Sequence, residues 1–142
     1  MSHLRIAAVA AAGVIVGMGA MHGMKAEEGP EKALGHTVFF TLKERSKENI
    51  DKTIAACKKY LGKHEGTIAF GVGVRAEEFS REVNDKEFDV ALHLVFKNKA
   101  AHDKYQDHPE HKKFIEENHD LWEKVRVFDD YIAVAELHKD RS

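Results

Sequence analysis

The 142-residue sequence lacks an excess of charge of either sign, since 22 lysines and arginines are matched by 24 aspartates and glutamates. A formal charge of -2 leaves no surplus of cations for phosphates, which excludes a dedicated nucleic-acid-binding protein. A mean hydropathy of -0.46 excludes a polytopic membrane protein. Cys57 is the one cysteine, so neither an internal disulfide nor a four-thiolate zinc site can form. We expect Cys57 to be a buried helix residue.

Charged residues are scarcest at the N-terminus, where Arg5 and Lys25 are the only ones in residues 1–26. A short basic region followed by the apolar and small residues 6–20 is typical of a signal peptide. We therefore expect an exported protein, periplasmic or extracellular, that leaves the membrane once residues 1–26 are cleaved. The alternative is a membrane anchor over residues 6–24, which are long enough to span a bilayer.

The rest of the chain divides into a linker, residues 27–35, and one domain, residues 36–138. Apolar residues that alternate predict strands, and apolar residues three or four apart predict amphipathic helices. Ser46, Asn98 and His108-Pro109 are suitable helix starts. In chain order we predict a strand at 36–43, a helix between Ser46 and Gly62, a strand at 67–74, a loop at 75–87, a strand at 88–96, helices over 98–106 and from 109, and a strand at 125–137.

This order predicts an α+β fold of ferredoxin-like type, a four-stranded antiparallel sheet with its helices on one face. Bulky apolar residues occupy both faces of the first and third strands, so we expect the uncovered face to pack against a second copy in a homodimer. On the second strand one face carries only small residues, which indicates close packing by another element or a bulge; these are Ala69, Gly71 and Gly73.

Histidine is the residue type in excess, with ten copies. His36 and His111 fall on faces that are predicted to point inward, and His108 is expected to be a cap. His93 lies on a strand face whose surroundings the pattern does not define. The histidines that we expect in solvent are His64, His102, His119 and His138.

Three segments carry more information than their periodicity. They are the opening His36-Thr-Val-Phe-Phe-Thr-Leu-Lys43, the helical Tyr105-Gln-Asp-His-Pro-Glu-His111 and the closing Trp122-Glu-Lys-Val-Arg-Val-Phe-Asp-Asp-Tyr131. Together they resemble the stress-responsive A/B barrel (Dabb) family, within the dimeric α+β barrel group. The resemblance spans residues 35–137 and implies a dimer in which two four-stranded sheets form one barrel.

The resemblance also implies site residues. A plant polyketide cyclase similar to this family closes a linear poly-β-keto chain to olivetolic acid by aldol condensation, with a histidine as general base and a tyrosine that assists the carbonyl. The motif match assigns the role of general base to His111, the role of the assisting tyrosine to Tyr105 and the position of a further pocket histidine to His36. An imidazole titrates near neutrality, which suits a base that acts on an acidic methylene. The loop at 75–87 and the export segment depart from that enzyme's pattern.

Three classes of function remain open. The first is a protein that binds a small organic ligand between sheet and helices. The second is an enzyme of the cyclase, isomerase or monooxygenase type that uses His111 and Tyr105, and the third is a structural dimer module. A histidine metal site is a further alternative, based on the spacing of His108 and His111 with His36, His102 or His119 nearby. We assign no cofactor and no metal ligand from the sequence.

Overall fold

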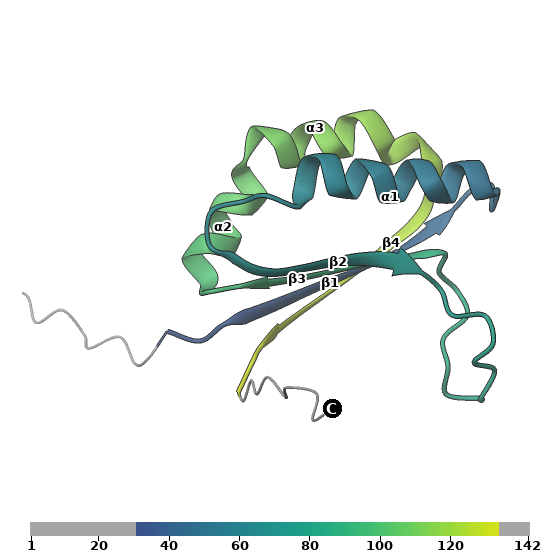
Figure 1. Ribbon diagram of the computed structural model, residues 1–142, viewed down its shortest axis with the longest axis horizontal. Coiled ribbons are helices and arrows are strands. Elements are labelled where there is room, and N and C mark those ends of the chain that lie inside the picture. The colour runs from purple at the N-terminus through teal and green to yellow at the C-terminus, as the bar shows by residue number, and fades with distance from the viewer. Residues whose placement is uncertain (1–30, 134–142) are drawn as a thin grey trace, which may run out of the picture.

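The computed structural model describes residues 31–133, and their order of elements is the predicted one (Figure 1). The last strand ends at Tyr131, so its predicted continuation through 132 and 133 was wrong. The predicted signal peptide at 1–26, residues 134–137 of the predicted strand and His138 lie outside the described residues. No helix in the described part is long and apolar enough to cross a bilayer. The elements are β1 (Leu34–Leu42), α1 (Lys47–Leu61), β2 (Thr67–Val74), β3 (Val90–Phe96), α2 (Lys99–Asp107), α3 (Pro109–Asn118), the 3-10 turn η1 (His119–Leu121) and β4 (Trp122–Tyr131).

The four strands form one antiparallel sheet in the order β2-β3-β1-β4. Helices α1 and α3 lie on one face of this sheet, and α2 crosses one end of it (Figure 1). We call the helix-covered face the inner face and the opposite one the outer face. The predicted ferredoxin-like α+β arrangement is therefore confirmed.

Two strands begin earlier than their apolar pattern predicts. β1 starts at Leu34 instead of His36, because Leu34 is already paired with both neighbouring strands. β4 starts at Trp122 instead of Val125, because Trp122 pairs with Leu42 at the other end of the ladder. The first and last strands are thereby paired along their whole shared length.

β3 begins two residues later than predicted, at Val90 instead of Phe88. Asp89 is buried just before the strand, and its carboxylate accepts a hydrogen bond from the backbone N–H of Leu42 at 2.8 Å. The same carboxylate forms an ion pair with Arg45 at 3.1 Å. Asp89 therefore joins the end of β1 to the start of β3.

The three predicted helix caps are confirmed. The side chains of Ser46 and Asn98 accept hydrogen bonds from the backbone of the first turns of α1 and α2, at 3.2 and 2.8 Å. His108 caps α3 through Nδ1, which accepts from the N–H of Glu110 at 3.1 Å, and Pro109 follows where its missing N–H costs no hydrogen bond. This turn fixes the direction of α3 relative to α2.

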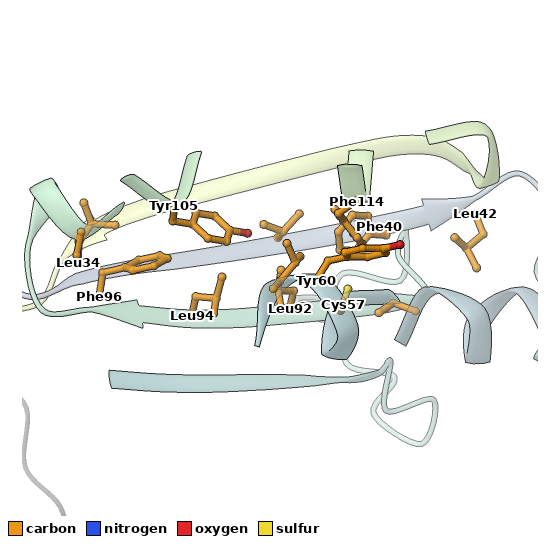
Figure 2. Close-up of a cluster of buried hydrophobic side chains, with 14 residues drawn as sticks. Leu34, Phe40, Leu42, Cys57, Tyr60, Leu92, Leu94, Phe96, Tyr105 and Phe114 are labelled. Atoms are coloured by element: carbon orange, nitrogen blue, oxygen red, sulfur yellow. The ribbon is translucent and has the colours of Figure 1, made fainter. Parts of the chain in front are cut away.

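The core lies between the inner face and the helices, and Figure 2 shows its side chains gathered over the strands of the sheet. Phe40 is 2% exposed and packs edge-on against Phe114. Cys57 is fully buried, as expected, and burial raises the pKa of its thiol to about 12. The thiol is therefore neutral and unreactive at physiological pH.

The outer face carries an aromatic patch centred on Phe39, whose ring lies 4.8 Å from that of Phe88 and 5.7 Å from that of Phe128. Beside the patch, a Cβ added at Gly71 or Gly73 would meet no atom within 4 Å. The expected close packing over these glycines is therefore not supplied by the described part of this chain. The alternative expectation, a bulge, is met by the register shift between Thr67 and Ala69.

Candidate functional site

A cavity of about 400 Å³ lies between the inner face and the helices. Nine of its thirteen lining residues are apolar: Val38, Phe40, Leu61, Leu92, Phe114, Ile115, Trp122, Val125 and Val127. The polar ones are the three predicted site residues, His36, Tyr105 and His111, together with Gln106. The structure therefore brings all three predicted residues to one apolar cavity.

Tyr105 extends from α2 into the space beneath the helices and is 2% exposed. Its ring lies 4.6 Å from that of His111 and 5.7 Å from that of His36. Figure 2 shows the hydroxyl pointing along the sheet toward Phe40 and Phe114. Burial raises the pKa of Tyr105 above its usual range, so the hydroxyl stays protonated and can donate a hydrogen bond.

His111 is held in one tautomer by the turn between α2 and α3. Its Nδ1 lies 3.1 Å from the carbonyl oxygen of Gln106. Because a carbonyl only accepts, Nδ1 carries the proton and Nε2 keeps a free lone pair. Burial lowers the pKa of His111, so the imidazole is neutral at physiological pH. A neutral imidazole of this kind can act as a base or accept a hydrogen bond from a ligand.

His36 is 3% exposed on β1, directly opposite Asp129 of β4. Its Nδ1 lies 2.6 Å from Oδ1 of Asp129. Burial lowers the pKa of His36, and the hydrogen bond to Asp129 opposes that effect. The sequence leaves the environment of Asp129 open, because a carboxylate on this strand could equally face solvent or an interface. The alternation of the strand does indicate that one carboxylate lies on the inner face, since it puts Asp129 and Asp130 on opposite faces.

Two histidines that were expected in solvent lie beside this site instead. His102 is only 14% exposed, and its ring lies 5.1 Å from that of His36, because it stands one helical turn before Tyr105 on α2. The ring of His64 lies 5.0 Å from that of Tyr105, and its Nε2 is 2.8 Å from the carbonyl oxygen of Tyr60. Both predictions of solvent exposure were wrong.

The remaining described histidines lie outside the cavity lining. His119 is exposed, as predicted, at the end of α3. His93 is exposed on the outer face, beside Phe39. His108 uses its side chain as a cap, so it does not join His111 in the metal-binding pair that their spacing suggested.

Trp122, which lines the cavity, has one polar atom without a partner. Its indole Nε1–H is buried, and none of residues 31–133 accepts a hydrogen bond from it. Most buried polar groups in proteins are hydrogen-bonded, so this donor is an exception.

An antiparallel β2-β3-β1-β4 sheet with helices on one face and a histidine-containing cavity beneath them defines a ferredoxin-like α+β protein with a pocket between sheet and helices. The chain belongs to the stress responsive A/B barrel domain (Dabb) family, whose model matches residues 34–132. The family resemblance found in the sequence is thus confirmed.

Solved structures with this fold include a Dabb family protein from Mesorhizobium loti, which is 25% identical over 74% of this chain and 100% of that chain, with a TM-score of 0.61. A hydroxynitrile lyase from Passiflora edulis is 22% identical over 76% of this chain and 100% of that chain, with a TM-score of 0.61. A dimeric ferredoxin-like protein from Thermobifida fusca is 14% identical over 72% and 92%, with a TM-score of 0.59. No curated protein matches the chain.

Proposed function

We propose that this protein binds a small, mainly apolar organic molecule that carries a carbonyl or similar acceptor oxygen. The observation that supports this most is the cavity itself, whose volume of about 400 Å³ is within the range of small-molecule sites. Its apolar walls favour an aromatic or aliphatic body. The hydroxyl of Tyr105 is a donor for the ligand's oxygen.

Trp122 provides a direct test, because it is the only tryptophan in the sequence and it lines the cavity. Benzoylacetone, an aromatic 1,3-diketone, is expected to change the fluorescence of Trp122 saturably. Val127→Phe should abolish that change, because Val127 lines the cavity from the edge strand and a phenyl ring there fills the space. The measurement is a fluorescence titration of the full chain.

Val83→Phe is the matched control, because Val83 is 84% exposed in the loop before β3 and does not line the cavity. It should leave the titration unchanged. Absence of saturable binding by the wild-type protein, or equal binding by Val127→Phe, would contradict the proposal.

We propose a second candidate function, general-base catalysis at carbon next to carbonyl groups. It is favoured by the geometry of His111, whose Nδ1–H is held by the Gln106 carbonyl while the Nε2 lone pair remains free. Nε2 would take a proton from the methylene of a 1,3-diketone, and Tyr105 would donate a hydrogen bond to the enolate oxygen. Returning the proton to carbon completes the cycle without any co-reactant.

The test of this candidate is hydrogen–deuterium exchange at C2 of benzoylacetone, followed by NMR in D₂O. His111→Gln should remove the protein's acceleration, about 10²- to 10⁴-fold for one positioned base, while benzoylacetone still quenches Trp122. Exchange that continues at the wild-type rate in His111→Gln would exclude this role for His111.

The pH dependence of the same exchange follows from the two pKa shifts. Only neutral His111 is a base, and burial lowers its pKa below 6.5, so the rate should fall only under acidic conditions below that value. Tyr105 donates only while protonated, and its raised pKa moves the alkaline limit above pH 10. We expect a plateau between these limits in the catalysed rate after subtraction of the buffer rate. A catalysed rate that halves between pH 9 and pH 7 would contradict this assignment.

We propose in addition that the protein is a homodimer that packs its outer faces together. Phe128 is 53% exposed there and belongs to the Phe39 patch, while the space over Gly71 and Gly73 is open to another chain. An exposed apolar patch on a sheet is typical of an interaction surface. The Thermobifida fusca protein of the same fold is also dimeric.

A further inference from the structure

Three potential metal ligands from three different elements meet at the end of the sheet beneath α2. They are His36 of β1, His102 of α2 and Asp129 of β4, and their donor atoms lie within 4.8 Å of one another. Oδ1 of Asp129 is 2.6 Å from Nδ1 of His36 and 3.9 Å from Nε2 of His102. Among residues 31–133 this is the one place where three such donors come so close.

These separations are close to those around a tetrahedral ion. Ligands about 2.0 to 2.1 Å from Zn²⁺ are about 3.3 Å from one another at the tetrahedral angle. The 2.6 Å and 3.9 Å separations from Asp129 lie on either side of this value, so binding requires the side chains to shift. Two imidazoles and one carboxylate are also a common donor set of catalytic zinc sites, in which the fourth position is left for water or substrate.

His102 has one side-chain contact at the nitrogen that would bind the ion. The side-chain nitrogen of Gln106 lies 3.2 Å from Nε2 of His102. An amide N–H donates, so Nε2 is the acceptor in this contact, and the ion would take the place of Gln106 at its lone pair. Nε2 is also the nitrogen that faces Asp129.

The cluster combines a buried end with an accessible one. His36 is 3% exposed, whereas Asp129 is 46% exposed, so an ion can enter from the side of β4. The negative charge of Asp129 is not neutralised by a lysine or arginine within the described residues, where its ion-pair partners are the two histidines. A divalent cation would compensate this charge.

We propose that His36, His102 and Asp129 bind one divalent transition-metal ion, with Zn²⁺ as the ion that the donor set fits best. The site differs from the His108 and His111 pair that the spacing in the sequence suggested. Because His36 also lines the cavity, the ion would lie at one end of it, close to Tyr105.

The test is calorimetric titration of Zn²⁺ alone into the tag-free full chain, stripped of metal with EDTA. We expect the wild type to bind one ion per chain. His102→Gln and Asp129→Asn should bind no ion, or bind it at least tenfold more weakly. Asp130→Asn and His119→Gln are matched controls that should bind as the wild type does. Asp130 adjoins Asp129 but points to the other face of β4, and His119 is exposed.

A second readout separates a lost ligand from a damaged fold. Co²⁺ bound to the wild type should give the visible absorption bands of a nitrogen- and oxygen-ligated ion, and these should be absent from His102→Gln. The same variant should still bind benzoylacetone by Trp122 fluorescence if the cavity proposal is right, because His102 does not line the cavity. No binding at 100 μM Zn²⁺, or equal binding by wild type, His102→Gln and Asp129→Asn, would overturn the metal site.

Discussion

Replacing Phe39 by aspartate is expected to convert the homodimer into monomers. Phe39 is at the centre of the outer-face patch, where its ring contacts those of Phe88, His93 and Phe128. A two-fold interface contains each residue twice, and loss of a central aromatic residue costs about 2 kcal/mol or more per copy. The dimer dissociation constant should therefore rise by about 10³-fold or more. Sedimentation velocity at 1 to 10 μM protein measures the change.

Val74→Asp is the control for this prediction. Val74 is an apolar strand residue that is 59% exposed, but it pairs with the buried Val90 and so belongs to the inner face. Its replacement should leave the dimer intact. A wild-type protein that sediments as a monomer, or a Phe39→Asp variant that remains dimeric, would show that the outer face is not the interface.

Replacing Phe40 by alanine is expected to lower the free energy of unfolding by about 3–5 kcal/mol. Phe40 is 2% exposed, and its ring lies 6.1 Å from that of Phe114 and 5.1 Å from that of Trp122. Its truncation would remove these contacts and enlarge the cavity that Phe40 lines. Since small domains are stable by only about 5–15 kcal/mol, this one change should remove a large share of the total.

Urea denaturation followed by circular dichroism measures this loss. Phe79→Ala is the control, because Phe79 is 56% exposed in the loop between β2 and β3, and its truncation should cost less than about 0.5 kcal/mol. Equal midpoints for the two variants would mean that Phe40 does not support the core as its burial indicates.

Local signals account for what could be predicted of the fold. Ser46 and Asn98 are caps whose effect depends on the next three residues only, so they were recognisable without any tertiary information. Alternation also predicts that Val90, Leu92, Leu94 and Phe96 share one face, as they do, but it puts Phe88 there too. Phe88 precedes the strand, and its ring lies against Phe39 on the outer face instead. The start of β4 was not predictable in this way, because Trp122 enters the strand by pairing with Leu42, which is remote in the sequence.

The candidate site was predictable in part. His36, Tyr105 and His111 were found through the family motif. His102 was missed because α2 has nine residues, too few apolar positions to define which side faces the sheet. Asp129 was missed because its contact with His36 depends on the register of two strands, which the pattern of either strand alone does not determine.

The pairing of β1 with β4 has a consequence for how the site is made during synthesis. His36 and Asp129 are separated by 93 positions in the chain, and the hydrogen bond between them requires the first described strand to meet the last. Contacts of such large sequence separation form late in folding, after the loop between them has closed. A nascent chain on the ribosome would therefore form its helices and central strands before the cavity is complete, because β4, which forms one wall of the cavity, is synthesised last.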